Sequence, residues 1–236
     1  FHLARSVILH SLTDPSFDRF YDVGSMFLPN LAMEGLTWVL THLMAAETAA
    51  RVFVALCILS PLAGAVLLHR AVHGRLTIWP LLVVALVHNG ILAFGFLNYL
   101  FGLGLALMAM ATWVTMRRRN GRLIVAFVWS MVLVFCHLEA FAVFAIMAAT
   151  SEVCAAFARR HQVGAGRSLR ELVYAGAPFF GVLALFFLMS PTSGAVVETA
   201  SYGSWLGAKP YGLLFSLSVH VFWLDILTAG ILLALV

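Results

Sequence analysis

Long apolar stretches separated by short polar segments dominate the pattern of this 236-residue chain. The apolar stretches cover residues 51–69, 76–116, 123–158, 172–190 and 213–236. A helix needs about 20 apolar residues to cross a hydrocarbon core of ~30 Å, so the second and third stretches are long enough for two crossings each. We therefore predict an all-α, polytopic transmembrane helix bundle with about seven spans, and with turns within 88–99 and around His137.

The first 46 residues are amphipathic rather than spanning. Pro29-Asn30 is predicted to introduce a short helix over 31–44, which could lie at the membrane interface. On that helix three side chains four residues apart share one face: Glu34, Trp38 and His42. We predict an outer first loop, 1–46, with amphipathic helices, followed by a transmembrane bundle, 47–236, that contains an outer loop over 191–212.

Arginines determine the predicted orientation. They gather in three clusters between the apolar stretches: Arg70 and Arg75; Arg117, Arg118, Arg119 and Arg122; Arg159, Arg160, Arg167 and Arg170. Short loops rich in Lys and Arg face the cytoplasm, and most acidic residues fall on the other side of the spans. We predict a multi-pass protein of the bacterial inner (cytoplasmic) membrane, with its N-terminal region on the periplasmic side.

Composition narrows the class of protein. The chain is 63% hydrophobic and 10% charged, whereas about 25% of the residues of an ordinary soluble domain are charged. The pI near 9.3 comes from the clustered arginines, so it indicates anionic lipid headgroups as partners and not nucleic acid. The three cysteines lack paired metal-ligand spacing, and no metal site is predicted from them.

The turn around His137 is predicted to be sunken. About 15 residues separate Leu123 from His137, and ~1.5 Å per residue gives roughly 22 Å, which is less than the ~30 Å core. Charged groups persist at that depth only when they line protein or water-filled space, so we predict an outward-opening cavity there. Glu139 is the first candidate for a catalytic base, with His137 beside it. The alternatives are a helix-capping pair and a divalent metal site, although His-x-Glu is too common a pattern to specify a metal.

Further candidates lie elsewhere along the chain. Asp22 and Glu34 are outward acids that could act in catalysis, or could simply be solvated. His88 and Asn98, near the other predicted turn, are candidate substrate ligands whose alternative role is to satisfy backbone groups. Asp225 is either a proton relay or a packing contact, and packing is favoured.

The predicted outer loop is rich in aromatic residues. Tyr202 and Trp205 could stack on a sugar, and Lys209 could bind a lipid-linked phosphate. The alternative is an interfacial aromatic belt, which is the more common use of such residues.

Four segments carry a resemblance to a known family. They are His-Leu-Ala-Arg at 2–5, Pro-Asn-Leu-Ala-Met at 29–33, Gly-Phe-Leu-Asn-Tyr-Leu-Phe-Gly-Leu-Gly-Leu at 95–105 and Phe-Cys-His-Leu at 135–138. With these segments the chain resembles a family of uncharacterised bacterial polytopic inner-membrane proteins, which is similar in layout to the GT-C superfamily of glycosyltransferases. The chain opens on Phe1 without a Met and closes inside an apolar run, 231–236, so it is expected to be a fragment. The resemblance implies an Asp-x-Pro segment with the catalytic acid upstream of Phe1. It also places His2 and Arg5 beside the site as ligands of the donor phosphate; the alternative is an interfacial helix with a snorkelling arginine.

The resemblance implies a membrane glycosyltransferase that uses a polyprenyl-phosphate-linked sugar on the non-cytoplasmic face. Two alternatives stay open: a transporter or flippase, and a non-catalytic accessory subunit that packs against other membrane subunits. The sequence specifies neither the sugar nor the acceptor, and whether the chain is an enzyme at all is left open.

Overall fold

The structure is a computed structural model, and it describes residues 29–159 and 164–189 together with Ile8, Trp223, Asp225, Ile226 and Gly230. Every element within the two ranges is helical. In chain order they are α3 (Ala32–Thr41), α4 (Ala46–His73), the 3-10 helix η1 (Trp79–Leu82), α5 (Val83–Val87), α6 (Gly90–Ala93), α7 (Leu97–Thr115), α8 (Arg122–Cys136), α9 (Leu138–Ala158) and α10 (Ala165–Met189). The predicted all-α class is confirmed for these residues, and α3 confirms the predicted helix after Pro29-Asn30.

Four of the described helices are long and apolar enough to cross a membrane. They are α4, α7, α9 and the Gly166–Met189 part of α10. These helices indicate a membrane protein, but the predicted count of about seven spans is not supported. Apart from four isolated positions, the last predicted span, 213–236, and the outer loop, 191–212, lie outside the described residues.

The first predicted hairpin is wrong in its outward arm. In place of one span, the chain forms η1, α5 and α6 before it enters α7. The Asn89 side chain accepts hydrogen bonds from the backbone N–H groups of Ile91 and Leu92, so it caps a new helix, α6, within the predicted turn. Gly95 then adopts φ 78°, a left-handed conformation that glycine accommodates without strain. Both breaks fall within the predicted turn, 88–99, whereas η1 and the five-residue α5 stand where one outward span was predicted.

The second predicted hairpin is confirmed as a pair of helices that meet at His137. The 15-residue α8 is apolar but shorter than the four candidate spans, and the 21-residue α9 is one of the four. The predicted short arm is therefore present as a short helix.

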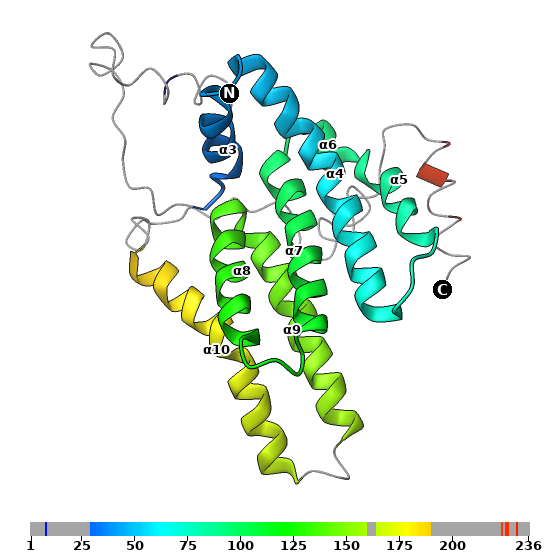
Figure 1. Cartoon of the computed structure of the whole chain (residues 1–236), viewed down its shortest axis with the longest axis vertical. Helices are drawn as coiled ribbons and strands as arrows, with labels where there is room; N and C mark the ends of the chain where they lie inside the picture. The colour runs from blue at the N-terminus through cyan, green and yellow to red at the C-terminus, as the bar shows by residue number, and fades with distance from the viewer. Residues whose placement is uncertain are drawn as a thin grey trace, which may run out of the picture.

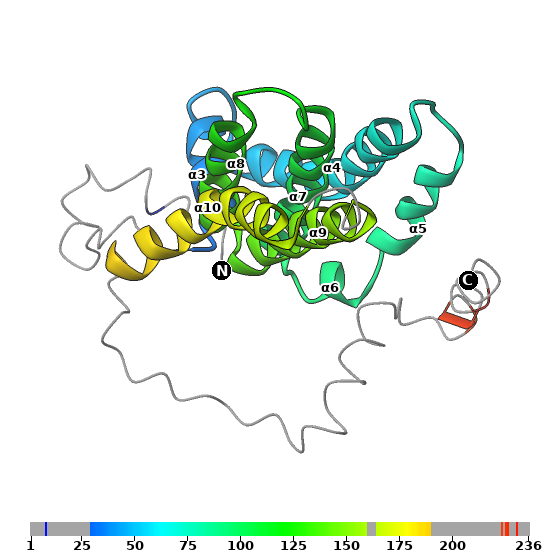
Figure 2. The ribbon, with the colours of Figure 1, turned by 90° about the horizontal axis from the view of Figure 1, so that it is seen from below.

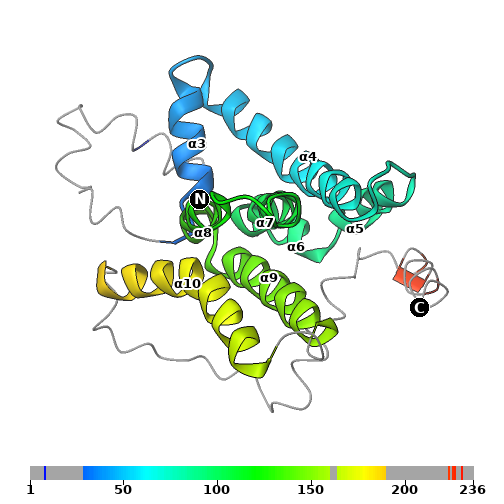
Figure 3. The ribbon, with the colours of Figure 1, turned by 60° about the horizontal axis from the view of Figure 1, so that its bottom comes forward.

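The bundle is arranged in layers. Figure 3 shows α7 and α8 nearly end-on, with α3 and α4 on one side and α9 and α10 on the other. Figure 2 shows α5 at the margin of the bundle beside α4. One cluster of buried apolar side chains links the four helices from α7 through α10 and is centred on Phe144 and Phe179. A second cluster links α3, α4 and α7 and is centred on Phe53 and Leu100.

Helices α4 and α7 run parallel and pack closely. The Cys57 thiol donates to the Leu97 carbonyl, and one turn further Ser60 lies against Phe101. Still further along, a Cβ at Gly64 would stand 2.5 Å from the Gly104 carbonyl oxygen, and a Cβ at Gly104 would overlap the Ser60 backbone. Because real Cβ atoms do not approach backbone so closely, both glycines are required for this helix contact.

Arginines of two clusters lie together: Arg117 and Arg122 line the same cavity as Arg159. Helix α4, whose last turn contains Arg70, runs parallel to α7 and ends on the same side of the bundle (Figure 1). We call this the arginine end. The opposite end, where α8 meets α9 and where α3 lies, is the His137 end.

Candidate functional site at the His137 turn

His137 separates α8 from α9. Its backbone is extended, at φ −169° and ψ 130°, and its Nδ1 accepts a hydrogen bond from the Glu139 backbone N–H at 3.3 Å. The imidazole thus acts as the N-cap of α9. The helix-capping alternative is present in the structure, and a catalytic role for the residue remains a prediction.

Glu139 lies in the first turn of α9 beside this imidazole. Its Oε2 is 4.0 Å from His137 Nδ1, and its side chain is 75% exposed against 21% for His137. The Tyr99 ring meets the imidazole edge-on, with centroids 5.4 Å apart. Burial lowers the pKa of His137, and the Glu139 carboxylate offsets part of that shift. A neutral imidazole that accepts at Nδ1 carries its proton on Nε2.

The turn is recessed relative to α4. Gly102 of α7 faces Ala140 and His137, and Leu97 lies level with Cys57. Helix α4 begins at Ala46, so it extends beyond the start of α7 by about 16 Å at ~1.5 Å per residue. The His137 turn therefore lies well below the top of the bundle (Figure 1). Its depth in a membrane remains a prediction.

The Glu139 side chain is exposed at this turn. Among the described residues, two cavities of about 540 and 470 Å³ lie at the arginine end, and neither is lined by His137 or Glu139. The exposed carboxylate therefore differs from the enclosed one that the sequence predicted. Ala140 and Phe141 of the same helical turn are buried, so Glu139 lies on the side of α9 that does not pack against the core. The predicted outward-opening cavity at the turn stays a prediction.

Asn98 anchors α3 across the recess. Its Oδ1 accepts from the Met33 N–H at 2.7 Å, and its Nδ2 donates to the Asn30 carbonyl at 2.8 Å. The Leu31 N–H donates to the Phe135 carbonyl at the end of α8, also at 2.8 Å. No side chain of its own caps α3, so Asn98 serves as its cap from another helix. Both functional groups of the amide are occupied by backbone, which is the alternative role that the sequence left open.

Helix α3 carries the second predicted carboxylate of this end. Glu34 is buried, at 2% exposure, whereas Trp38 is 45% exposed. His42 is exposed too, and its ring lies edge-on to Trp38 with centroids 4.9 Å apart. The predicted shared face thus holds for Trp38 and His42, while Glu34 turns toward the bundle.

The remaining predicted residues are not brought to this turn by the described structure. His88 is exposed at the end of α5, with Nδ1 3.0 Å from the Val84 carbonyl oxygen. Asp225 is half-buried at one of the isolated described positions. The other candidates lie outside the described residues: His2, Arg5, Asp22, Tyr202, Trp205 and Lys209.

Sequence reasoning missed the contact between Tyr99 and His137. Tyr99 follows Asn98 in the first predicted turn. If the two predicted turns had been placed side by side, the contact between Tyr99 and His137 would have been expected. As for metals, within the described part of the chain no three His, Cys, Asp or Glu side chains gather in a way that could hold an ion.

Comparisons with protein-family models, with curated proteins and with solved structures found no match to this chain. The family resemblance therefore remains a proposal.

Proposed function

We propose that this chain is a GT-C-like glycosyltransferase of the bacterial inner membrane, acting at its His137 end on a sugar linked to polyprenyl phosphate. The observation that carries the proposal is the turn set below the start of α4, with the exposed Glu139 carboxylate 4.0 Å from Nδ1 of the His137 imidazole. A general base has to be open to its substrate and held in place, and Glu139 meets both requirements because α9 begins at a fixed cap.

In the proposed reaction Glu139 accepts the proton of an acceptor hydroxyl. The acceptor oxygen then forms a bond to the anomeric carbon of the sugar, and the bond from that carbon to the phosphate oxygen breaks. Polyprenyl phosphate leaves with the electron pair. The Nε2–H of neutral His137 is free of the capping contact and can donate a hydrogen bond to a sugar or phosphate oxygen.

Access from the lipid supports a lipid-linked donor. Helix α3 lies over the recess and exposes Trp38, Val39 and, just beyond its end, Leu43. Exposed apolar side chains on a short helix are typical of an element at the membrane interface. A donor with its isoprenoid tail in the bilayer can bring its headgroup to the recess along this helix.

The orientation follows from charge. The arginine end collects the basic clusters, which face the cytoplasm under the positive-inside rule. The His137 end then faces the periplasm, where a lipid-linked sugar would be presented.

Two rival functions have less support. The transporter hypothesis invoked similar hairpins at 76–116 and 123–158, but the first has a broken outward arm and the second a continuous α8. The accessory-subunit hypothesis relied on small-residue faces, but Gly64, Gly102 and Gly104 are occupied by contacts within the chain.

The test is turnover by the full-length protein in proteoliposomes that contain polyprenyl-phosphate-linked sugars. Release of polyprenyl phosphate is measured for the wild type and for Glu139→Gln. Loss of a general base lowers the rate by about 10²–10⁴-fold, and we expect a loss in that range.

Glu47→Gln is the matched control. Glu47 is also an exposed glutamate in the first turn of a helix at the His137 end, and we expect its replacement to leave turnover unchanged. Equal rates for Glu139→Gln and the wild type would refute the assignment of Glu139. No sugar transfer by the wild type with any polyprenyl-linked donor would refute the proposed activity itself.

A further inference from the structure

A basic groove lies at the arginine end, on the opposite side of the bundle from the His137 turn. It is formed by the α7–α8 turn, the start of α8, the end of α9 and α10, and has a volume of about 540 Å³. Its charged lining consists of five arginines and two glutamates, which leaves a formal charge of +3. A second cavity of about 470 Å³ shares Arg117, Arg118 and Arg159 with it.

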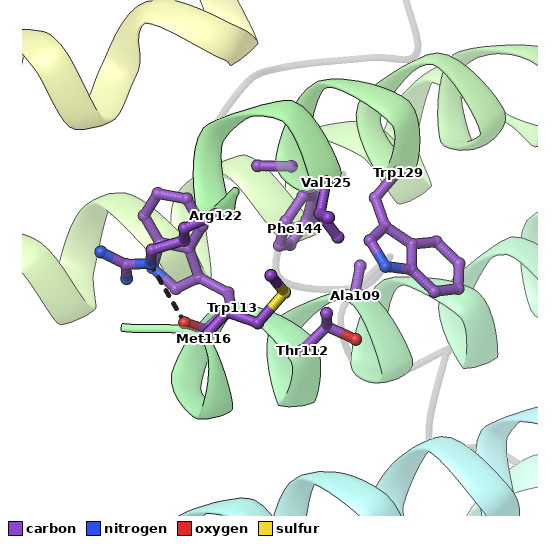
Figure 4. A pocket seen from close by; sticks show the side chains of 9 residues that line it. Ala109, Thr112, Trp113, Met116, Arg122, Val125, Trp129 and Phe144 are labelled. Carbon is purple, nitrogen blue, oxygen red and sulfur yellow. Dashed lines mark hydrogen bonds between the residues drawn. The ribbon is translucent and has the colours of Figure 1, made fainter. Parts of the chain in front are cut away.

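Arg122 has a structural role in this groove. It donates to Glu152 at 2.6 Å. It also donates to the Trp113 carbonyl at 3.1 Å, and its guanidinium carbon lies 3.4 Å from the centre of the Trp113 ring (Figure 4). These contacts join α7, α8 and α9. The depression beside Trp113 in Figure 4 leaves no space for a water-sized molecule, so it is packing and not a binding site.

Arg159 is also paired. Its guanidinium lies 3.3 Å from Glu171, and its Nε donates to the Ala155 carbonyl at 3.2 Å. Glu171 additionally binds Arg167 at 3.2 Å. The two glutamates of the groove are thus both engaged by arginines that hold helices together.

The α7–α8 turn adds three more positive charges to the groove. Residues 117–119 are consecutive arginines with exposed side chains. Backbone hydrogen bonds hold the turn in shape: Arg117 N–H to the Val114 carbonyl, Arg119 N–H to the Met116 carbonyl, and Arg122 N–H to the Arg119 carbonyl. Among the described residues, the ion pairs with the two glutamates of the groove are made by Arg122 and Arg159. The three arginines of the turn, 117–119, therefore supply the excess positive charge of the groove.

We propose that this groove binds a phosphate group, supplied by the headgroup of an anionic phospholipid. Guanidinium groups bind phosphate oxygens through charge-assisted hydrogen bonds, and basic pockets between membrane helices at the cytoplasmic side bind lipid headgroups. The excess of positive charge in a concave site favours an anion, and fixed turn geometry reduces the entropy lost on binding.

The surroundings of the groove favour a lipid over a soluble phosphate. Tyr174 lines the groove and is 70% exposed, and Val173 beside it is exposed too. Phe157, at the end of α9, adds further exposed apolar surface. Apolar side chains next to a basic groove can contact acyl chains while the headgroup lies among the arginines. This inference does not depend on the proposed glycosyl transfer, because it concerns the other end of the bundle.

The test is a titration of the full-length chain in a neutral detergent, with bound ligand measured by native mass spectrometry. Phosphatidylglycerol is the anionic lipid, phosphatidylcholine the lipid without net charge, and inorganic phosphate the soluble source. Arg117→Gln/Arg118→Gln removes two exposed groove charges. We expect phosphatidylglycerol to bind about thirtyfold more weakly to this variant, since each arginine near an anionic headgroup contributes ~1 kcal/mol.

Arg70→Gln/Arg75→Gln is the matched control, because it removes two exposed arginines of the same end that do not line the groove. A second variant, Glu171→Gln, removes a negative charge from the groove and should tighten binding. Inorganic phosphate that binds as tightly as the lipid, with the same difference between variants, would overturn the lipid source. No binding, equal weakening by both double variants, or equal binding of phosphatidylcholine would overturn the site.

Discussion

Replacement of Asn98 by alanine should release α3 from the recess. The change removes two hydrogen bonds and leaves the Met33 N–H and the Asn30 carbonyl without them. Asn98 is 3% exposed, so water does not readily replace its amide. An unsatisfied buried backbone group costs about 1–3 kcal/mol. This cost applies to the N–H of Met33, which is buried, whereas Asn30 is exposed and its carbonyl can accept from water.

That energy has a measurable consequence in hydrogen exchange. A loss of about 2 kcal/mol raises the population of the undocked helix by roughly thirtyfold, since 1.4 kcal/mol is a factor of ten. Exchange of the α3 amides, measured by mass spectrometry on the detergent-solubilised protein, should accelerate by about that factor. Alanine is a better helix former than asparagine, so α7 itself should not be weakened.

Two variants control this experiment. Asn120→Ala changes an exposed asparagine in the α7–α8 turn and should leave α3 exchange as in the wild type. Asn98→Asp keeps an acceptor for Met33 but loses the donor to Asn30, so it should give an intermediate effect. Unchanged α3 exchange in Asn98→Ala would refute the reasoning that this amide holds the helix in place.

Three further predictions concern the packing of the bundle, measured as unfolding in a mild detergent. Gly104→Ala should destabilise the chain by about 1–3 kcal/mol because the new Cβ overlaps the α4 backbone. Gly121→Ala should be tolerated, since its Cβ would meet one methionine methyl at 3.8 Å. Equal stability of the two variants would contradict the close packing of α4 on α7. Glu152→Gln should lower the free energy of unfolding by about 2 kcal/mol because its partner, Arg122, is largely buried at 13% exposure. Glu171→Gln breaks a more exposed pair and should lower it by at most about 1 kcal/mol. The reverse order would be inconsistent with this geometry. His137→Ala should cost about 0.5–1 kcal/mol through loss of the helix cap, and His137→Asn should restore it; no difference between them would argue against capping.

The sequence predicted the parts of the fold that depend on hydropathy and charge. The α8–α9 hairpin, its turn at His137 and the helix after Pro29-Asn30 follow from apolar periodicity and from turn residues. The gathering of arginines at one end follows from their spacing between apolar stretches. These features depend on neighbouring residues, or on the alternation of apolar stretches with arginine clusters along the chain. A single sequence can therefore reveal them.

Features that depend on contacts between distant segments were not predictable in this way. The stretch 76–87 is apolar enough to suggest a span, but it forms η1 and the short α5 beside α4. The backbone role of Asn98 depends on α3, which lies 65 residues earlier in the chain. The exposure of Glu139 depends on which side of α9 packs against α7, and hydropathy does not specify this.

The most direct test of the account asks whether Glu139 is open on the face opposite the arginine end. In a chain whose exposed Cys154 is replaced by serine, Glu139→Cys and Arg118→Cys are compared in intact spheroplasts with a membrane-impermeant maleimide. The buried Cys57 and Cys136 provide an internal background. The account predicts labelling of Glu139→Cys from outside, and of Arg118→Cys only after the membrane is permeabilised. Labelling of both from the same side, or protection of Glu139→Cys from both sides, would contradict it.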